Sequence, residues 1–180
     1  MTPEEPEKIE WQGRFITAKT RGRWEYVSRA RGIRAAVVLA IDDDDHVLLV
    51  QQYRVPLGCI CIELPAGLIG DGDEPEEDIA AAARELEEET GYRAERMEVL
   101  GEFWSSPGMV TESYSLFRAH GLTRVGEGGG TDSEAITVHH IPLAGIVKAV
   151  ADWREAGYAI DTKLLLLLAP GILGAGSQAK

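Results

Sequence analysis

The chain has 180 residues and 44% apolar content, which predict one compact domain with a sizeable core. It carries 18 Lys and Arg against 30 Asp and Glu, giving a formal net charge of -12. This charge repels polyanions and argues against a sequence-independent nucleic-acid binder, which needs its own cations to neutralise phosphates. Small phosphorylated ligands stay compatible if a divalent metal supplies positive charge.

Neither end of the chain resembles a targeting or membrane segment. Residues 1–10 are acidic and contain proline, without the apolar centre of a signal peptide. The apolar run at residues 164–168 is far shorter than the roughly 18 residues that suggest a membrane span. We therefore expect a cytoplasmic protein that binds neither membranes nor nucleic acids.

The N-terminal part predicts a β-hairpin arm. After a tail that we expect to be mobile up to residue 10, residues 14–19 and 24–29 predict two short strands around a turn at Arg21 and Gly22. We place this tail and strand arm within residues 1–31, with the main domain at residues 32–180.

Three further strands are expected next, at residues 33–41, 47–53 and 59–64. The four aspartates at residues 42–45 do not have the spacing of an EF-hand loop, so we interpret them as a solvated hairpin turn. The two cysteines lie one residue apart on the third strand. Their side chains should point to opposite faces and cannot easily form a disulfide.

The longest helix is predicted over residues 74–90. Asp73 and Glu76 form a capping box, Pro75 suits the first turn, and Gly91 supplies a left-handed C-terminal end. We expect strands at residues 97–104, 113–119 and 135–141, a flexible loop at residues 126–130, and helices at residues 143–156 and 162–169. This order of elements indicates a mixed α/β sandwich.

Three carboxylates share one face of this helix. Glu85, Glu88 and Glu89 occupy positions i, i+3 and i+4, a spacing at which like charges destabilise an isolated helix. Carboxylate oxygens are hard ligands suited to Mg²⁺ or Mn²⁺. A cation site is one interpretation, and a solvated acidic helix face is the alternative.

The residues around this cluster resemble the signature of Nudix hydrolases. That signature is Gly, five residues, Glu, seven residues, Arg-Glu, an aliphatic residue, any residue, Glu-Glu, any residue, Gly and an apolar residue. This sequence matches each fixed position, with Gly70, Glu76, Arg84, Glu85, Leu86, Glu88, Glu89, Gly91 and Tyr92. The resemblance implies a Nudix-type α/β/α sandwich with a mixed sheet, an N-terminal β-hairpin arm, and a catalytic domain at residues 32–180.

Most of residues 20–145 resembles one branch of that family, the ADP-ribose pyrophosphatases and nucleoside-diphosphate-sugar hydrolases. The resemblance rests on Gln-Gln-Tyr-Arg at residues 51–54 and Glu-Leu-Pro-Ala-Gly at residues 63–67. In this branch the signature opens at the glycine of Pro-Ala-Gly, here Gly67, whereas the count above starts at Gly70. The structural roles of Gly70 and Glu76 therefore stay open.

The resemblance implies a metal-dependent hydrolase. Glu85, Glu88 and Glu89 would hold two or more Mg²⁺ ions, or Mn²⁺ as a substitute, together with the backbone carbonyl of Ala66. Arg84 would orient these carboxylates through charge-assisted hydrogen bonds.

A general base is implied in the late loop. Glu134 is the first candidate and Asp132 the second, because a glutamate on a glycine-rich loop can move in when substrate binds. An ordinary exposed acidic side chain is the alternative interpretation of Glu134.

The same resemblance implies five substrate contacts. Trp24 would stack on the nucleobase, Glu25 would accept from an exocyclic amine, and Arg29 would add a polar contact. Arg54 would contact a phosphate, and Glu112 the terminal sugar or a metal. Packing of Trp24 in the arm or in a dimer interface is the alternative.

We therefore expect hydrolysis of ADP-ribose to AMP and ribose 5-phosphate by a homodimer whose partner is a small nucleoside diphosphate sugar. Hydrolysis of GDP-mannose is the close alternative, and a sensor that binds a nucleotide sugar without turnover is the other. The four histidines receive no role, because none has ligand spacing with an acidic partner; they are His46, His120, His139 and His140.

Overall fold

The structure, a computed structural model, describes residues 5–29, 33–69, 77–131 and 135–174, with side chains up to residue 169. In chain order, its elements are β1 (Lys8–Gln12), β2 (Ile16–Arg21), β3 (Trp24–Arg29), β4 (Arg34–Ala40), β5 (His46–Arg54), β6 (Cys59–Glu63), β7 (Ala66–Ile69), α1 (Asp78–Thr90), β8 (Tyr92–Trp104), β9 (Ser113–Arg124), β10 (Thr137–Pro142), η2 (Leu143–Gly145), α2 (Ile146–Glu155), β11 (Ala159–Ile160), η3 (Thr162–Leu164) and α3 (Leu165–Gly174).

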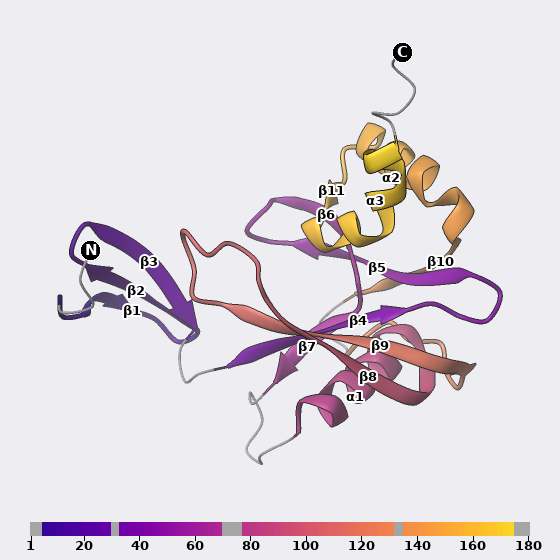
Figure 1. Cartoon of the computed structure of the whole chain (residues 1–180), viewed down its shortest axis with the longest axis horizontal. Coiled ribbons are helices and arrows are strands. Elements are labelled where there is room, and N and C mark those ends of the chain that lie inside the picture. Colours follow the sequence, from indigo (N-terminus) through magenta and orange to yellow (C-terminus); the bar gives the residue numbers. More distant parts are fainter. Residues whose placement is uncertain (1–4, 30–32, 70–76, 132–134, 175–180) are drawn as a thin grey trace.

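The N-terminal arm is a three-stranded antiparallel sheet, β1-β2-β3, that stands to one side of the other sheets (Figure 1). The hairpin predicted around Arg21 and Gly22 is confirmed, with Gly22 in the left-handed region at φ 58°. The expectation of a mobile chain is wrong for residues 8–10, because they belong to β1, which pairs with β2. A polar contact across the strands supports this pairing, since Glu10 of β1 accepts a hydrogen bond from Thr20 of β2 at 2.8 Å.

Two mixed four-stranded sheets form the rest of the fold. One has the order β7-β4-β9-β8, with β4 parallel to β9, and the other has the order β10-β5-β6-β11, with β6 parallel to β11. Helix α1 lies against the first sheet, and α2 and α3 lie against the second (Figure 1). The α/β/α sandwich is therefore confirmed, with the expected mixed sheet divided in two.

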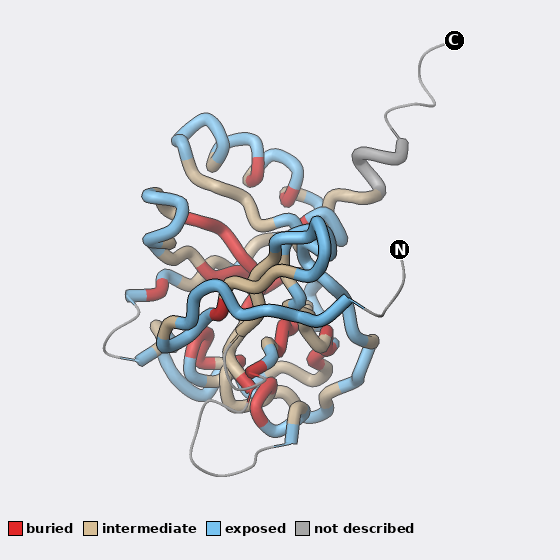
Figure 2. Tube along the Cα trace, turned by 90° about the vertical axis from the view of Figure 1, so that its left-hand side faces the viewer, coloured by how far each residue is buried: buried red, intermediate tan, exposed pale blue. Residues whose placement is uncertain are grey.

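Strand β4 contributes to both halves of the core. Its side chains alternate between two faces, so Ala36, Val38 and Ala40 pack with α1, whereas Val37 packs in the cluster that includes α2. Small side chains on both partners, including Ala81 of α1, let the helix lie close to the sheet. Buried segments lie between the layers (Figure 2), so α1 and its carboxylates rest on a packed support.

Helix α1 begins at Asp78, four residues later than predicted. Glu77 has an extended backbone and no side-chain cap hydrogen bond, while the carboxylate of Asp78 is held by Arg34 of β4 at 2.7 Å. This contact fixes the first turn of the helix on the sheet. The predicted start at residue 74 and its capping residues lie outside the described residues. The C-terminal prediction is confirmed, because Gly91 has φ 74° and donates to the Glu87 carbonyl.

The four aspartates form a turn, but β4 and β5 do not form the predicted hairpin. The two strands belong to different sheets and meet only at the bridge between Ile41 and Val47. Asp42 Oδ1 accepts hydrogen bonds from the backbone N–H groups of Asp44 and His46, at 3.0 and 2.8 Å. The turn therefore carries the chain from one sheet to the other.

The apolar run at residues 164–168 belongs to the core and helix α3. Leu164 is fully buried in the cluster that contains Val150 of α2, and Leu167 and Leu168 pack against that cluster. Within the described part of the chain, no helix has the length and apolar character needed to cross a membrane.

Both cysteines are free, as their positions on β6 predict. Burial raises the pKa of the Cys61 thiol to about 12, with Glu63 as a further cause. Cys61 is therefore protonated at neutral pH and is a poor metal ligand or nucleophile.

Candidate active site

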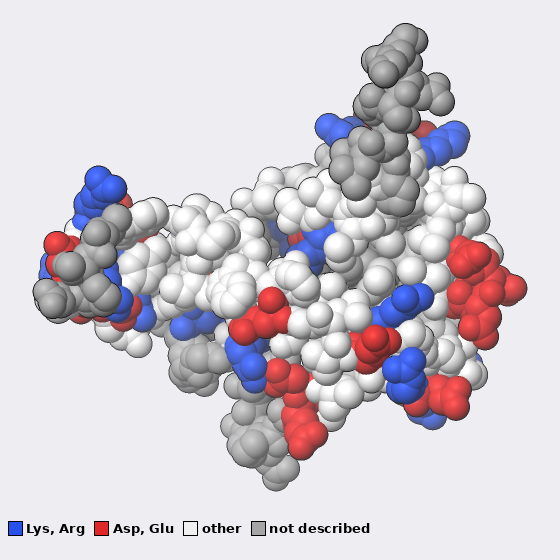
Figure 3. Space-filling view, viewed as in Figure 1, with Lys and Arg blue, Asp and Glu red and all other residues white. Residues whose placement is uncertain are grey.

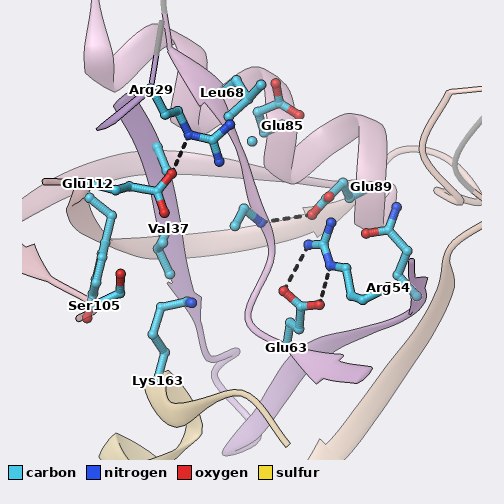
Figure 4. Close-up of a pocket in the computed structure, with 15 residues that line it drawn as sticks. Arg29, Val37, Arg54, Glu63, Leu68, Glu85, Glu89, Ser105, Glu112 and Lys163 are labelled. Atoms are coloured by element: carbon cyan, nitrogen blue, oxygen red, sulfur yellow. Dashed lines mark hydrogen bonds and ion pairs between the residues drawn. The ribbon is translucent and has the colours of Figure 1, made fainter. Parts of the chain in front are cut away.

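A cavity of about 460 Å³ opens where β4, β6, β7 and α1 meet (Figure 4). It collects charged side chains from distant parts of the sequence, namely Arg29, Arg54, Glu63, Glu85, Glu89, Glu112 and Lys163. Such a mixed lining suits a charged ligand whose phosphates bind both metal ions and guanidinium groups.

Glu85 and Glu89, one helical turn apart on α1, provide the acidic wall of this cavity. Glu89 is only 4% exposed, and its Oε2 accepts a hydrogen bond of 2.9 Å from the backbone N–H of Ala66 (Figure 4). Burial of a carboxylate is costly unless the group is hydrogen-bonded, paired or bound to a cation. Ala66 begins β7, so the β7 backbone meets α1 at this carboxylate.

Gly67 allows the close approach of β7 to Glu85. A Cβ atom at this position would lie 1.9 Å from the Glu85 Cδ. The glycine of Pro-Ala-Gly therefore has a clear structural role beside the carboxylates. Gly70 and Glu76, the other candidates for the start of the signature, lie outside the described residues.

We expect Gly67→Ala to displace the Glu85 carboxylate and to raise the Mg²⁺ concentration needed for half-maximal turnover by on the order of 10-fold. Titration of activity against Mg²⁺ measures this effect. Gly145→Ala is the matched control, because a Cβ there meets nothing within 4 Å. Equal Mg²⁺ dependence of the Gly67 variant and wild type would show that this close approach is not needed.

Arg84 bridges two of the three carboxylates. Its guanidinium lies 2.9 Å from Glu85 Oε1 and 2.9 Å from Glu88 Oε2. This geometry fits the predicted orienting role, since each contact offsets the repulsion between like charges. The Glu88 side chain is 41% exposed, and among the described residues the cavity lining includes neither Glu88 nor Arg84. The assignment of Glu88 as a metal ligand stays a prediction.

Arg54 lies in the cavity in a pair that the sequence reasoning missed. It donates two hydrogen bonds to the buried Glu63, at 2.6 and 2.9 Å, and these bonds raise the pKa of Arg54 against the opposing effect of burial (Figure 4). Arg54 is therefore held charged at the position where a phosphate contact was predicted. The sequence did offer one signal for this pair, because Glu63 is a single charged residue at the end of the otherwise apolar strand of residues 59–63.

Arg29 and Glu112 form an ion pair on another wall of the cavity (Figure 4). The backbone holds them together, because Val27 of β3 donates to the Met109 carbonyl and accepts from the Thr111 N–H, each at 2.9 Å. Two predicted substrate contacts are thus brought to the same cavity. Each neutralises part of the other's charge.

Lys163 is a cavity residue that nothing in the sequence singles out. It lies in η3, far along the chain from the Nudix signature, and its ammonium is 2.7 Å from Asp161 and 5.5 Å from the centre of the Tyr114 ring. Only the packing of the C-terminal segment on the second sheet brings it to the cavity.

Trp24 lies in a different cavity, of about 410 Å³, between the arm and residues 107–111. It is 45% exposed, and the walls beside it include Arg21, Tyr26 and Val110. Glu25 is exposed, and neither cavity includes it in the described part of its wall. The structure therefore does not bring Trp24 and Glu25 to the carboxylates of the same chain.

The glycine-rich loop is packed on the C-terminal end of α1, so the expectation of a flexible loop at residues 126–130 is wrong. Gly129 and Gly130 donate to the carbonyls of Glu89 and Glu88, at 2.8 and 3.0 Å. Gly128 has φ 70°, and a Cβ there would lie 2.4 Å from the Thr90 backbone. Glycine at position 128 is thus required both for the close contact with the end of α1 and for the left-handed backbone conformation of the loop. The base candidates Asp132 and Glu134 lie outside the described residues.

A sandwich of this architecture, with an acidic helix face beside a Pro-Ala-Gly strand, defines a class of metal-dependent phosphoanhydride hydrolases. A model of the NUDIX domain matches residues 31–157, which is well over half of the chain. The chain belongs to the Nudix family.

Several relatives are similar over part of their length. A methanol dehydrogenase activator of Bacillus methanolicus is 41% identical over 56% of this chain and 52% of the relative. An ADP-ribose pyrophosphatase of Bacillus subtilis (strain 168) is 38% identical over 64% of this chain and 62% of the relative. The chain thus spans between half and two thirds of these two proteins. A GDP-mannose pyrophosphatase of Cronobacter sakazakii is 40% identical, over 77% of this chain and 72% of the relative.

A solved structure described as an ADP compounds hydrolase has the same fold. It superposes with a TM-score of 0.69 at 24% identity, and the match covers 95% of this chain and 94% of that one. At this identity the likeness concerns the fold.

Proposed function

We propose that the chain hydrolyses the diphosphate bond of a nucleoside diphosphate sugar, with ADP-ribose as the preferred substrate and AMP and ribose 5-phosphate as the products. The observation that carries this proposal is one cavity with the carboxylates of Glu85 and Glu89 on one wall and the cations Arg54 and Lys163 nearby. The names of the relatives, ADP-ribose pyrophosphatase and GDP-mannose pyrophosphatase, support the substrate class.

The residues present fit Mg²⁺. Glu89 is a buried carboxylate, and Gly67 leaves room for Glu85 directly beside the β7 backbone. Glu85, Glu88, Glu89 and the carbonyl of Ala66 would hold the metal, with Mn²⁺ as a substitute. When bound, the metal supplies charge neutralisation at the diphosphate and acidifies water.

The side chains then divide the remaining work. Arg84 keeps the carboxylates in place, and Arg54 and Lys163 bind phosphate oxygens. Glu134 takes a proton from the water that attacks phosphorus, with Asp132 as the second candidate. The bond from that phosphorus to the bridging oxygen breaks, and the bridging oxygen leaves with the other phosphate group.

Recognition of the two ends of the substrate falls to the arm and its neighbouring loop. Arg29 and Glu112 lie in the carboxylate cavity, where they suit the terminal sugar, and Trp24 and Glu25 suit the nucleobase. Because Trp24 lies in a separate cavity of its own chain, we place it against the substrate of a partner in a homodimer. Exposed apolar side chains on the arm, Ile9, Trp11 and Phe15, support burial of this surface between two copies.

We expect Trp24→Ala to raise the KM for ADP-ribose by roughly 5- to 150-fold, because stacking on a base contributes about 1–3 kcal/mol. Turnover should change less, since the base lies away from the reacting phosphorus and binds equally in the ground and transition states. Steady-state kinetics with sedimentation analysis measure both effects.

Trp153 provides a control of the same residue type. It is partly buried against the core and lies edge-on to His139, so Trp153→Ala should lower stability without a selective effect on KM. An unchanged KM in a stable Trp24→Ala dimer would remove Trp24 from the binding site. Loss of the dimer with both kinetic constants degraded would favour the packing role.

A hydrolysis panel tests the substrate directly. With Mg²⁺ present, ADP-ribose, GDP-mannose, ADP-glucose, diadenosine polyphosphates and deoxynucleoside triphosphates are compared by kcat/KM, with products identified. We expect ADP-ribose to give the highest value. A higher value for GDP-mannose would reassign the base and sugar, and binding without turnover of any of these compounds would favour the sensor.

A further inference from the structure

A second group of potential ligands lies at the end of the fold where β4 turns into β5. Asp42 Oδ2 lies 2.6 Å from His140 Nε2, Asp42 Oδ1 lies 3.7 Å from His46 Nδ1, and the two imidazole centres are 4.6 Å apart. One ligand atom from each residue lies within 4.8 Å of the others. These histidines received no role because their sequence spacing shows no acidic partner; the turn nevertheless places Asp42 near His46, and the pairing of β10 with β5 brings His140 to the same carboxylate.

His46 Nδ1 marks this group as incomplete. Among the described residues, it is the one buried side-chain nitrogen or oxygen atom that has no hydrogen-bond partner. An unsatisfied buried nitrogen is costly, and such groups usually bind water or an ion. The nearest carboxylate oxygen, Asp42 Oδ1, already accepts two backbone N–H groups.

We propose that Asp42, His46 and His140 form a site for a divalent transition metal, best matched to zinc, separate from the carboxylate cavity. Two imidazole nitrogens and one carboxylate, with water in a fourth position, are a common zinc ligand set. Tetrahedral zinc with bonds of about 2.0 Å separates its ligand atoms by roughly 3.3 Å. The observed 2.6 Å to Asp42 Oδ2 and 3.7 Å to Asp42 Oδ1 lie on either side of that value, so zinc binding requires shifts of up to about 0.7 Å.

The scaffold holds two of the three ligands on adjacent paired strands. In the antiparallel pair of β5 and β10, His46 faces Pro142 and His140 faces Leu48, so the histidines are diagonal neighbours. Asp42 is oriented by the N–H groups of Asp44 and His46. This group offers imidazole nitrogens, which suit zinc, whereas Glu85 and Glu89 offer only oxygen atoms, which suit Mg²⁺.

The position and charge of the group also suit a cation. Asp42 lies five positions after Val37, and Val37 is the strand partner of Ala66 in the carboxylate cavity. At the usual rise of an extended chain, this places Asp42 roughly 16 Å from that cavity. The turn adds the exposed carboxylates of residues 43–45, and acidic side chains gather at this edge of the molecule (Figure 3). A bound metal would join the turn after the first sheet to β10 of the second sheet, and so stabilise the sandwich.

Zinc titration of the full untagged chain tests this site. The metal-free protein is titrated with Zn²⁺ by calorimetry in excess Mg²⁺, which occupies the carboxylate cavity. We expect one zinc ion per chain and a higher melting temperature with zinc. His46→Ala and His140→Ala should each weaken zinc binding by on the order of 100-fold. His120→Ala is the matched control, because His120 pairs with Glu98 of β8 and is not one of the three candidate ligands.

Two further measurements keep the test decisive. Zinc binding should persist in Glu85→Gln/Glu89→Gln, which removes the carboxylates of the cavity. Cobalt in the wild-type chain should give the intense visible absorption of a tetrahedral site, whatever the stability of the histidine variants. The proposal is overturned by absence of zinc binding at micromolar concentrations, by equal binding in the His46 and His140 variants, or by loss of binding in Glu85→Gln/Glu89→Gln.

Discussion

Glu85→Gln and Glu89→Gln are each expected to lower turnover by roughly 10³-fold, which corresponds to about 4 kcal/mol of transition-state stabilisation. Each change removes a charged oxygen ligand from the wall of the cavity. The fold should survive, because the amide oxygen introduced by Glu89→Gln can still accept the Ala66 N–H hydrogen bond. Melting temperatures should stay close to wild type or rise slightly, since repulsion between neighbouring carboxylates is relieved.

Glu87→Gln is the matched control for these variants. Glu87 belongs to the same helix, but it pairs with Arg93 at 2.8 Å and lies outside the described lining of the cavity. The comparison uses turnover at saturating Mg²⁺ together with thermal unfolding. Near-wild-type rates in both the Glu85 and the Glu89 variant would contradict the metal assignment, and a comparable loss in the Glu87 variant would point to a general effect of helix charge.

Glu134→Gln is the second change with a large expected effect, a loss of roughly 10²–10⁴-fold in turnover, which is the usual contribution of a positioned general base. Substrate binding should change little, because the amide has nearly the same size as the carboxylate. Asp132→Asn should have the smaller effect.

The pH dependence of the residual activity adds a second readout for this loop. Removal of the base should abolish the acidic limb of the rate profile, whereas a merely structural role would lower the rate without changing its shape. A severe loss in Asp132→Asn with little change in Glu134→Gln would assign the base to Asp132.

The carboxylate face could be predicted from the sequence because helix periodicity is local. Glu85 and Glu89 are four residues apart, so their common direction follows from the 3.6-residue turn alone. Most strands of the sandwich were also recognisable from their apolar, β-branched composition, whereas the short strands β7 and β11 were not predicted. The division into two sheets was not, since it depends on which strands pair after the chain turns at Asp42.

The missed residues depend on contacts between distant segments. His140 and Asp42 are 98 positions apart, and only the pairing of β10 with β5 brings them together. Lys163 enters the cavity through the packing of the C-terminal segment, for which the Nudix signature gives no signal. The first strand was missed because its stabilising contacts are polar, as with Glu10 and Thr20, whereas strand prediction follows apolar alternation.

The fate of the water oxygen distinguishes cleavage of the diphosphate bond from cleavage elsewhere in the substrate. ADP-ribose is incubated with the chain and Mg²⁺ in ¹⁸O-water, and the products are analysed by mass spectrometry. We expect AMP and ribose 5-phosphate with one ¹⁸O in a phosphate group, formed in a reaction that requires Mg²⁺ and is lost in Glu85→Gln/Glu89→Gln. Release of ADP with the label in the ribose, or equal turnover in that double variant, would contradict hydrolysis of the diphosphate bond by the α1 carboxylates.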